Sequence, residues 1–476
     1  MFKKTRFKHL LGAIVIGSFA AISTPAMASN EAMLDLLKIL VKKGSITAEE
    51  YELLETAAKA DGKKAESNIS QMKAEVEKVE KKTADLPKIN TNGKFEITKG
   101  DNKFRLTGRL HIDTLFAGND DGYANSSNTS FRRARIGARG TWAKYWDWKF
   151  EFDLEDAQDS DQAIEDGWIK YTKLPVDITI GQRRSGYGMS EFVSSNKFTF
   201  IERSFVSDLF HHQSLGVGGR TMGITFTKEW DHWLTEHGYY TLRNAPGGIT
   251  NFDQGHGYSG RVVWSDYDKE EQTLLHAGIS GGHRSYGNNT ISRFQVRPNV
   301  AQGSRIIDSD GAIAASNYTS FNFNAAAAYK QLWASGEYFY GSFDLDGNPA
   351  GDDDMEGFFV QAGYFLTKGD ARPYKKSVGS WSTVKPKNAF NKGGWGALEV
   401  AVRYDHATLG SAVNGGALEE EGSAFTAALN YYATHNIRLQ ANYIKAFCDT
   451  GECDWDSGTI GAGEPGMFLL RAQTWF

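Results

Sequence analysis

The chain has little proline and, after its first 28 residues, no long apolar run. It contains 9 prolines and 51 glycines among 476 residues, and 13% of its residues are aromatic. A transmembrane helix needs roughly 18 or more consecutive apolar residues, so helical spans are excluded from the later part of the chain. The composition suits many β-strands with one polar and one apolar face. A large secreted β protein could share it, so composition alone does not decide.

Cysteine and net positive charge are also lacking. The two cysteines, Cys448 and Cys453, have four residues between them, and in an exported protein they could close one small disulfide loop. Two sulfurs without nearby histidine partners do not make a zinc site, and we predict no metal site or cofactor. The formal net charge of −5 becomes −9 when four basic leader residues are removed, which argues against nucleic-acid binding.

Residues 1–28 predict a secretory signal peptide. A positively charged start leads into an apolar core and then a small-x-small cleavage site, at Lys3–Lys8, Leu10–Ile22 and Ala26–Ala28. The alternative is an uncleaved anchor helix, but the apolar core is short for a bilayer span and Pro25 ends it. We therefore expect a mature chain that begins near Ser29.

Residues 29–90 predict a periplasmic helical segment and linker. Ala32–Lys43 has the pattern of one helix closed by Gly44, and Thr47 with Glu50 has capping-box spacing for a second helix. Apolar residues then recur at spacings of three, four and three: Ile69, Met72, Val76 and Val79. This seam indicates a short coiled coil that joins protomers. The alternative is a solvated helix or a flexible spacer.

Residues 91–476 predict an antiparallel transmembrane β-barrel, an all-β fold. From about residue 103 the sequence alternates with period two, and residues 146–155 alternate strictly between apolar and charged side chains. A closed soluble core could not hold so many ionised groups, whereas a wide barrel has a wet inner face and a lipid-facing outer face. We count sixteen or seventeen strand candidates and choose sixteen, because single-chain bacterial barrels have even numbers. Such a barrel is wide enough for an aqueous channel.

The chain ends in an amphipathic strand with a terminal aromatic residue, Met467–Phe476. This ending resembles bacterial outer-membrane proteins, in which it serves as the signal for the barrel-assembly machinery. The predicted location is therefore the outer membrane of a Gram-negative cell, with outer-membrane lipid around the barrel and with residues 29–90 in the periplasm.

Short motifs along the barrel resemble the phosphate-selective porin O and P family. They are Leu106–Leu110, Phe131–Ala134, Trp146–Lys149, Phe200–Ser204, Tyr364–Thr367 with Arg372–Tyr374, Gly393–Glu399 with Arg403–Tyr404, and Leu429–Tyr432. Residues 36–51 are similar to the leader of many members. The resemblance implies a sixteen-stranded, homotrimeric, anion-conducting porin whose third loop folds inward to narrow the pore.

The resemblance also assigns residues to the constriction. Arg132 and Arg133 match the family's constriction arginines, Glu165 matches an acidic residue there, and Ser194 and Ser195 match serines of the inward loop, which we place at about residues 182–216. Planar guanidinium groups suit phosphate because their forks match its oxygens. Strand neighbours face opposite sides, so Arg132 joins Arg133 in the lumen only if the strand begins or bulges there. Otherwise Arg132 snorkels to the interface or meets another protomer.

A second arginine run weakens the case for a dedicated phosphate site. Arg293 and Arg297 fit the family's arginine ladder above the constriction, but Gln295 and Asn299 interrupt it, and Phe192 replaces a family lysine. The ladder arginines could instead balance acids of the lumen. We therefore expect modest anion preference.

The predicted function is passive diffusion of small hydrophilic solutes through a porin that prefers anions such as phosphate. The first alternative is a general, weakly selective porin. An outer-membrane enzyme is a second alternative, with Ser194, Ser195 and His211 as candidates, but no motif joins these residues, and we predict no enzyme. An envelope tether built from residues 29–90 is the third.

Overall fold

The computed structural model describes residues 25–84, 86–91, 93–117, 126–155, 163–241, 255–287, 290–301, 305–309, 311–345, 353–411, 420–448 and 466–476. Nearly all of the predicted signal peptide lies outside these ranges, as does Cys453, so the predicted disulfide falls outside the described residues. The chain forms two compact units, residues 1–87 and 88–476. No helix among the described residues is long and apolar enough to cross a membrane.

The first unit contains two helices, α1 (Pro25–Lys42) and α2 (Ala48–Ala84). Gly44 follows α1 with a φ of 70°, and the hydrogen bonds Gly44 N to Val41 O and Ser45 N to Leu40 O close the helix as a Schellman motif. The capping box before α2 is present: Thr47 N donates to Glu50 Oε2 at 2.8 Å and Glu50 N donates to Thr47 Oγ1 at 3.2 Å. These bonds lower the pKa of Glu50.

The predicted coiled-coil seam lies on the second half of α2. Met72, Val76 and Val79 are 49%, 43% and 55% exposed, so α1 does not cover them. The single chain leaves this apolar face uncovered, and its pairing with another copy stays a prediction.

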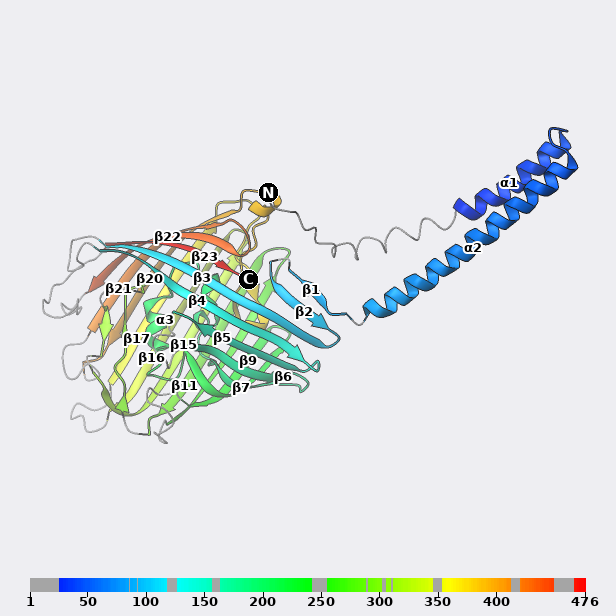
Figure 1. Ribbon diagram of the computed structural model, residues 1–476. Coiled ribbons are helices and arrows are strands. Elements are labelled where there is room, and N and C mark those ends of the chain that lie inside the picture. The colour runs from blue at the N-terminus through cyan, green and yellow to red at the C-terminus, as the bar shows by residue number, and fades with distance from the viewer. Residues whose placement is uncertain are drawn as a thin grey trace, which may run out of the picture. The chain divides into compact units, whose positions relative to one another are not determined.

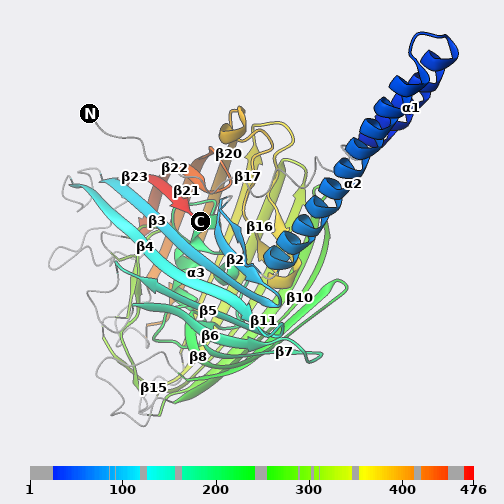
Figure 2. The ribbon, with the colours of Figure 1, turned by 45° about the vertical axis from the view of Figure 1, so that its right-hand side comes forward.

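The second unit is a closed antiparallel barrel (Figures 1 and 2). Nineteen strands share one sheet within the described residues, and sixteen of them form the barrel wall once β1 (Lys88–Asn90), β2 (Phe95–Lys99) and β12 (Thr290–Ile291) are set aside. The wall strands are β3 (Asn102–Ala117), β4 (Ser126–Trp142), β5 (Trp146–Asp153), β6 (Ile164–Tyr171), β7 (Asp177–Arg184), β8 (Arg220–Trp230), β9 (Trp233–Thr241), β10 (His256–Asp268), β11 (Thr273–Ser285), β15 (Ile313–Tyr329), β16 (Leu332–Leu345), β17 (Asp353–Phe365), β20 (Ala397–Leu409), β21 (Glu420–Tyr432), β22 (Ile437–Cys448) and β23 (Gly466–Trp475). The predicted strand number is confirmed.

The last strand closes the barrel against the first. β23 pairs with β3 from Met467 opposite Ala117 to Trp475 opposite Arg109, and Figure 2 shows the two strands side by side. Phe476 N donates to Gly108 O at 3.0 Å. A Cβ at Gly108 would lie 2.4 Å from the Phe476 ring, so the absent side chain makes room for the terminal aromatic. We call the rim with both barrel ends the terminal rim and the opposite one the distal rim.

Alternation along the strands gives the wall two faces. On β4, Ile136 is 45% exposed on the outside, whereas Arg133 and Arg135 are less than one-tenth exposed inside. Phe150 on β5 also faces outward, next to the inward Glu151. Polar side chains line the inside and apolar ones the outside, as the alternation predicts.

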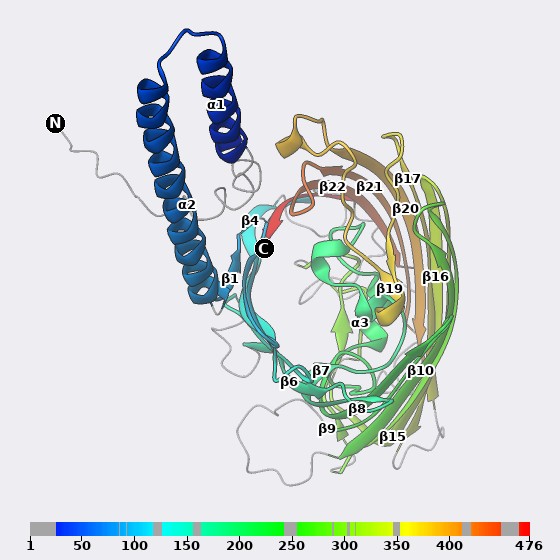
Figure 3. The same cartoon turned by 90° about the vertical axis from the view of Figure 1, so that its right-hand side faces the viewer.

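Three connections fold into the barrel. From the distal rim come residues 185–219, the inward loop, which contains α3 (Phe205–Phe210), and the described residues of the connection 286–312, with β13 (Gln295–Val296) and β14 (Ile307–Asp308). From the terminal rim comes the basic loop, residues 366–396, with β18 (Tyr374–Lys375) and β19 (Ser380–Trp381). Figure 3, a view along the barrel, shows α3 and β19 inside the ring of strands.

Two apolar clusters hold these connections against one part of the wall. One joins Phe205, Phe210 and Phe294 to Phe339 and neighbouring wall residues. The other joins Met189, Phe198, Tyr374, Trp381 and Trp333. Burying each large apolar side chain contributes about 1.5–3 kcal/mol. The packed loops therefore leave the charged lumen on the side of β3 to β9.

Candidate functional site

The inward loop is held to the wall by side chains that donate to its backbone. In the segment Phe198–Arg203, the carbonyl oxygens of all residues but Phe200 accept from wall side chains: Arg438 at 2.5 Å, Gln440 at 3.0 Å, Arg471 at 2.5 Å and Arg403 at 3.1 Å, the last on two carbonyls. An unpaired buried carbonyl is costly, so this row of donors fixes where the loop places its own side chains.

A β-bulge brings both constriction arginines into the lumen. On β3, His111 lies opposite Arg133 and Ile112 lies opposite Phe131, which leaves Arg132 as the extra residue on β4. A bulge re-aims the side chains at its position. Arg132 and Arg133 therefore both reach inward, while Phe131 stays outside and 56% exposed. From the sequence, Arg132 could face the lumen only with a strand start or a bulge at this point, and the bulge is present.

A second bulge lies on β6, two strands from β4 in the barrel wall. Glu151 on β5 lies opposite Asp166 and Phe152 lies opposite Ile164, which leaves Glu165 as the extra residue. Glu165 and Asp166 are consecutive, yet both are less than one-tenth exposed and lie on the inner side. The two bulges thus supply two adjacent cations and two adjacent carboxylates to the same part of the pore.

Glu202 of the inward loop neutralises the constriction arginines. Its Oε1 lies 3.1 Å from Arg132 Nε, 3.3 Å from Arg133 Nη1 and 2.7 Å from Arg471 Nη2. Arg471 also forms two 2.6 Å bonds to Asp113. The three guanidinium groups hold the pKa of Glu202 well below its usual range, against the opposing effect of burial. The arginine pair is therefore satisfied by a carboxylate of the chain itself.

Glu165 lies in a similar arrangement on the wall. Arg135 Nη2 reaches its Oε1 at 2.6 Å, and Arg220 pairs with its other oxygen. Arg135 also bonds Asp153 at 2.6 Å and lies 3.7 Å from Glu151. Guanidinium and carboxylate groups thus alternate along this wall.

The two loop serines lie beside this row. Arg109 Nη1 donates to Ser195 Oγ at 2.8 Å and to Ser194 Oγ at 3.4 Å, while its Nη2 reaches Glu151 at 3.1 Å. His211 lies instead near Ser207, at 3.2 Å. Contacts therefore connect Glu165 to Ser194 and Ser195 through neighbouring arginines.

A third carboxylate, Glu191, lies between two more arginines. Arg184 pairs with its Oε1, and Arg203 Nη1 lies 3.6 Å from its Oε2. Burial alone would raise its pKa, but these positive charges lower the pKa of Glu191 to about 2. Its carboxylate occupies the position between two guanidinium groups where a solute anion could otherwise bind.

Lys197 differs from these paired cations. Within the described part of the chain it forms no ion pair with a carboxylate, and the charged groups that act on it are Lys375, Arg139, Arg109 and Arg372, all of them cations. Burial and these positive charges lower the pKa of Lys197 to about 8. Lys375, on the basic loop, has a lowered pKa for the same two reasons. Glu229 opposes this shift at Lys375, so positive charge gathers here around Lys197 and is partly compensated around Lys375.

A lumen cavity of about 480 Å³ opens at this level. It lies between the inner faces of β6 to β9 and the basic loop, and its lining includes Trp168, Lys170, Arg183, Glu236 and Lys375. The residue that replaces the family lysine, Phe192, does not line it; its ring packs 3.4 Å from the Arg261 guanidinium.

Arg293 and Arg297 lie elsewhere. Both belong to the connection 286–312, where Arg293 Nε and Nη2 reach Asp308 at 2.6 and 2.5 Å. The structure brings five of the seven expected site residues into the inward-loop region and leaves these two on a separate connection.

Several charged residues of the site were not among the expected site residues, and three of them contact the expected ones directly: Arg109, Glu202 and Arg471. Alternation identifies Arg109 and Arg471 as facing the lumen but does not say which loop they meet. Glu202 lies in a segment that served only as a family motif. One signal could have identified Glu202. It is an acidic residue inside a family motif, in a loop that was expected to face arginines.

Comparison with known proteins identifies the family. The sequence model of the family described as "Phosphate-selective porin O and P" matches residues 104–450. Porin O of Pseudomonas aeruginosa is 26% identical over 397 residues, with 76% of this chain and 87% of that protein covered. An uncharacterized protein of Caulobacter vibrioides is 26% identical over 378 residues, with 76% and 72% covered.

Solved structures match the fold. OmpT of Vibrio cholerae, an outer-membrane protein, aligns with a TM-score of 0.50 at 13% identity, over 80% of this chain and 99% of that one. At this identity the likeness concerns the barrel alone. The match to the family model covers most of the sequence and identifies the family as well as the fold. This chain belongs to the phosphate-selective porin O and P family and is an outer-membrane β-barrel porin, a channel and not an enzyme.

Proposed function

We propose that this porin lets small hydrophilic solutes diffuse passively through its lumen with a modest preference for anions, phosphate included, and without a dedicated phosphate site. The observation that carries the proposal is the contrast between two groups of cations. Arg132, Arg133 and Arg135 are all paired with carboxylates of the chain, whereas Lys197 has only cations as close charged neighbours. A pore selects by the net charge along its lining.

The paired arginines argue against tight phosphate binding. A phosphate ion at Arg132 and Arg133 would have to displace Glu202, which is tethered in place and also bound by Arg471. Charge-assisted bonds to guanidinium are among the stronger ones, and the tethered carboxylate loses little freedom when it forms them. A solute anion competes with it at a disadvantage, so the constriction favours passage over binding.

The unpaired cations supply the anion preference. Lys375 lines the 480 Å³ cavity, together with paired cations and acids such as Glu229, and Lys197 lies close enough to Lys375 for the two charges to interact. Positive charge with low-dielectric walls concentrates anions. The terminal rim faces the periplasm in this proposal, as expected for a barrel with both ends there. Homotrimeric assembly is proposed from family resemblance.

A reversal-potential measurement in planar bilayers under a KCl gradient tests this function. The wild-type chain should show a small potential of the sign that marks anion preference. The double variant Arg132→Ala, Arg133→Ala should lose part of that preference, because Glu202 keeps its negative charge when two cations are removed. A cation-selective wild-type channel, or the same potential in the double variant, would contradict the proposal.

A further inference from the structure

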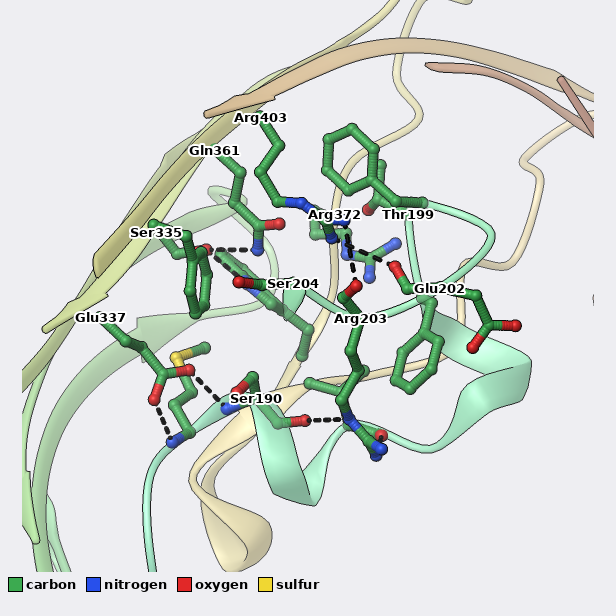
Figure 4. Close-up of a pocket in the computed structure, with 16 residues that line it drawn as sticks. Ser190, Thr199, Glu202, Arg203, Ser204, Ser335, Glu337, Gln361, Arg372 and Arg403 are labelled. Atoms are coloured by element: carbon green, nitrogen blue, oxygen red, sulfur yellow. Dashed lines mark hydrogen bonds between the residues drawn. The ribbon is translucent and has the colours of Figure 1, made fainter. Parts of the chain in front are cut away.

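A small cavity lies behind the inward loop, between that loop and the wall strands β16, β17 and β20. We call it the rear cavity. It has a volume of about 40 Å³ and a lining of apolar side chains, neutral polar side chains, the carboxylates Glu202 and Glu337, and three arginines: Arg203, Arg372 and Arg403. Figure 4 shows Arg372 and Arg403 reaching the same corner of the cavity, beside Thr199.

Two of these arginines have their hydrogen bonds made. Arg403 donates through Nε to Asp405 at 3.0 Å and through its other nitrogens to backbone carbonyls of the inward loop. Arg203 donates to the carbonyls of Ser190 and Val193 at 3.3 and 3.1 Å and lies near Glu191. Neither has a charge left without a partner.

Arg372 is different. It extends from the basic loop, is 4% exposed, and donates through Nη2 to Lys197 O. Its Nε and Nη1 have no hydrogen-bond partner, and Thr199 Oγ1 beside it also has none. Among the described residues Arg372 forms no ion pair with a carboxylate, and the one other partner of its charge is the ring of Trp333, whose centroid lies 5.4 Å from the guanidinium carbon. A buried charge without a counter-ion is strongly unfavourable.

The acids around the rear cavity cannot supply that counter-ion. Glu337 accepts from the backbone nitrogens of Met189 and Ser190 at 3.0 and 2.6 Å, and Glu202 is held by the constriction arginines. Glu399, farther along the wall, accepts from Trp333 and other donors. Each carboxylate is fixed away from Arg372 by bonds of its own.

We propose that the rear cavity binds one small monovalent anion, chloride in the cell, with Arg372 as its principal ligand and the Thr199 hydroxyl as a second donor. The size fits a single ion: a water molecule needs about 10–15 Å³ of such space, so 40 Å³ holds a halide but not a phosphate ion with its own shell of donors. The anion neutralises Arg372 and thereby holds the basic loop against the inward loop. The rear cavity and the 480 Å³ lumen cavity have different linings, and the proposal stands without the proposed anion preference.

Anomalous scattering from crystals of the full chain grown with bromide tests the proposal. The expected result is an anomalous peak inside the rear cavity in contact with the Arg372 guanidinium. Electron density there without an anomalous signal would identify water and overturn the proposal, and so would bromide peaks confined to the open lumen. Because occupancy is read from the crystal and not from current, failure here leaves the proposed channel selectivity untouched.

Variants locate the ligand. Arg372→Gln should lose the bromide peak, whereas Lys385→Gln, an exposed residue of the same loop, should keep it. A peak that survives in Arg372→Gln would refute the assignment of the ligand.

If Arg372→Gln does not assemble, a measurement on the wild-type chain alone still tests whether the rear cavity binds chloride. Its thermal midpoint should be higher in potassium chloride than in potassium gluconate of equal ionic strength, because gluconate is too large for the cavity. Equal midpoints would refute the proposal.

Discussion

Glu202 is the residue whose removal should change the pore most. Glu202→Gln keeps the size and hydrogen-bonding oxygen of the side chain but removes the negative charge shared by Arg132, Arg133 and Arg471. The constriction gains one positive charge. A unit charge about 5 Å from a permeating ion acts with about 0.8 kcal/mol at a dielectric constant of 80 and about 3 kcal/mol at 20. The smaller figure alone changes the partition of each ion roughly fourfold.

The anion-to-cation permeability ratio should therefore rise on the order of tenfold, because anions gain and cations lose. Reversal potentials in planar bilayers measure this ratio, and lower salt should enlarge the difference between wild type and variant. Glu421→Gln, on the outward face of β21 near the distal rim, is the matched control and should leave the ratio unchanged. An unchanged ratio in Glu202→Gln would refute the view that this carboxylate neutralises the pore arginines.

Glu202→Gln should also lower stability. Breaking a buried ion pair by removal of one partner costs about 3–5 kcal/mol, although Asp113 still compensates Arg471. The lowered pKa of Glu202 makes its contribution present above the unfolded-state pKa and lost as the pH falls through the lower folded-state value. Thermal unfolding followed by circular dichroism at neutral pH should show the variant melting at a lower temperature.

Three further results are expected. Lys197 is protonated below its pKa of about 8, so anion preference should be full below that pH and fall as the pH rises through it; reversal potentials should show this step in wild type and lose it in Lys197→Gln. Gly108→Val places a side chain against the Phe476 ring, and overpacking of this kind costs about 1–3 kcal/mol, so the yield of assembled barrel should fall, whereas an unchanged yield would contradict the closure described here. Thr47→Ala removes the capping box and should cost α2 about 1 kcal/mol, seen as faster amide hydrogen exchange in its first turn but not in the barrel.

The barrel and the helices could be predicted because their signals are local. Period-two alternation needs only neighbouring residues, and it correctly placed Arg133 inside and Ile136 outside. The capping box of Thr47 and Glu50 was likewise confirmed, because its bonds join residues three apart.

The contents of the lumen could not be predicted in the same way. In the basic loop, Tyr374 and Trp381 pack against Trp333 and the inward loop. Such contacts join residues far apart in sequence, and no local pattern specifies them. The bulges at Arg132 and Glu165 are similar: one extra residue in a strand leaves the local pattern almost unchanged but reverses which face a side chain occupies.

The seven expected site residues also fall into two groups, those on regular strands or the inward loop and those on an irregular connection. Arg132, Arg133, Glu165, Ser194 and Ser195 come together because the strands and the inward loop follow the family's order. Arg293 and Arg297 matched a family ladder by spacing, but their connection places Arg293 against Asp308. Their role in the pore stays a prediction, since spacing does not determine how an irregular connection folds.

The chloride current of the purified protein in planar bilayers, titrated with phosphate, distinguishes a constriction neutralised by its own carboxylates from one that binds phosphate. If the constriction arginines are neutralised by Glu165, Glu191 and Glu202, the channel conducts chloride with modest anion preference and added phosphate changes the current little. A saturating block at low phosphate concentration would mean that phosphate displaces these carboxylates, and the account of a self-neutralised constriction would be wrong.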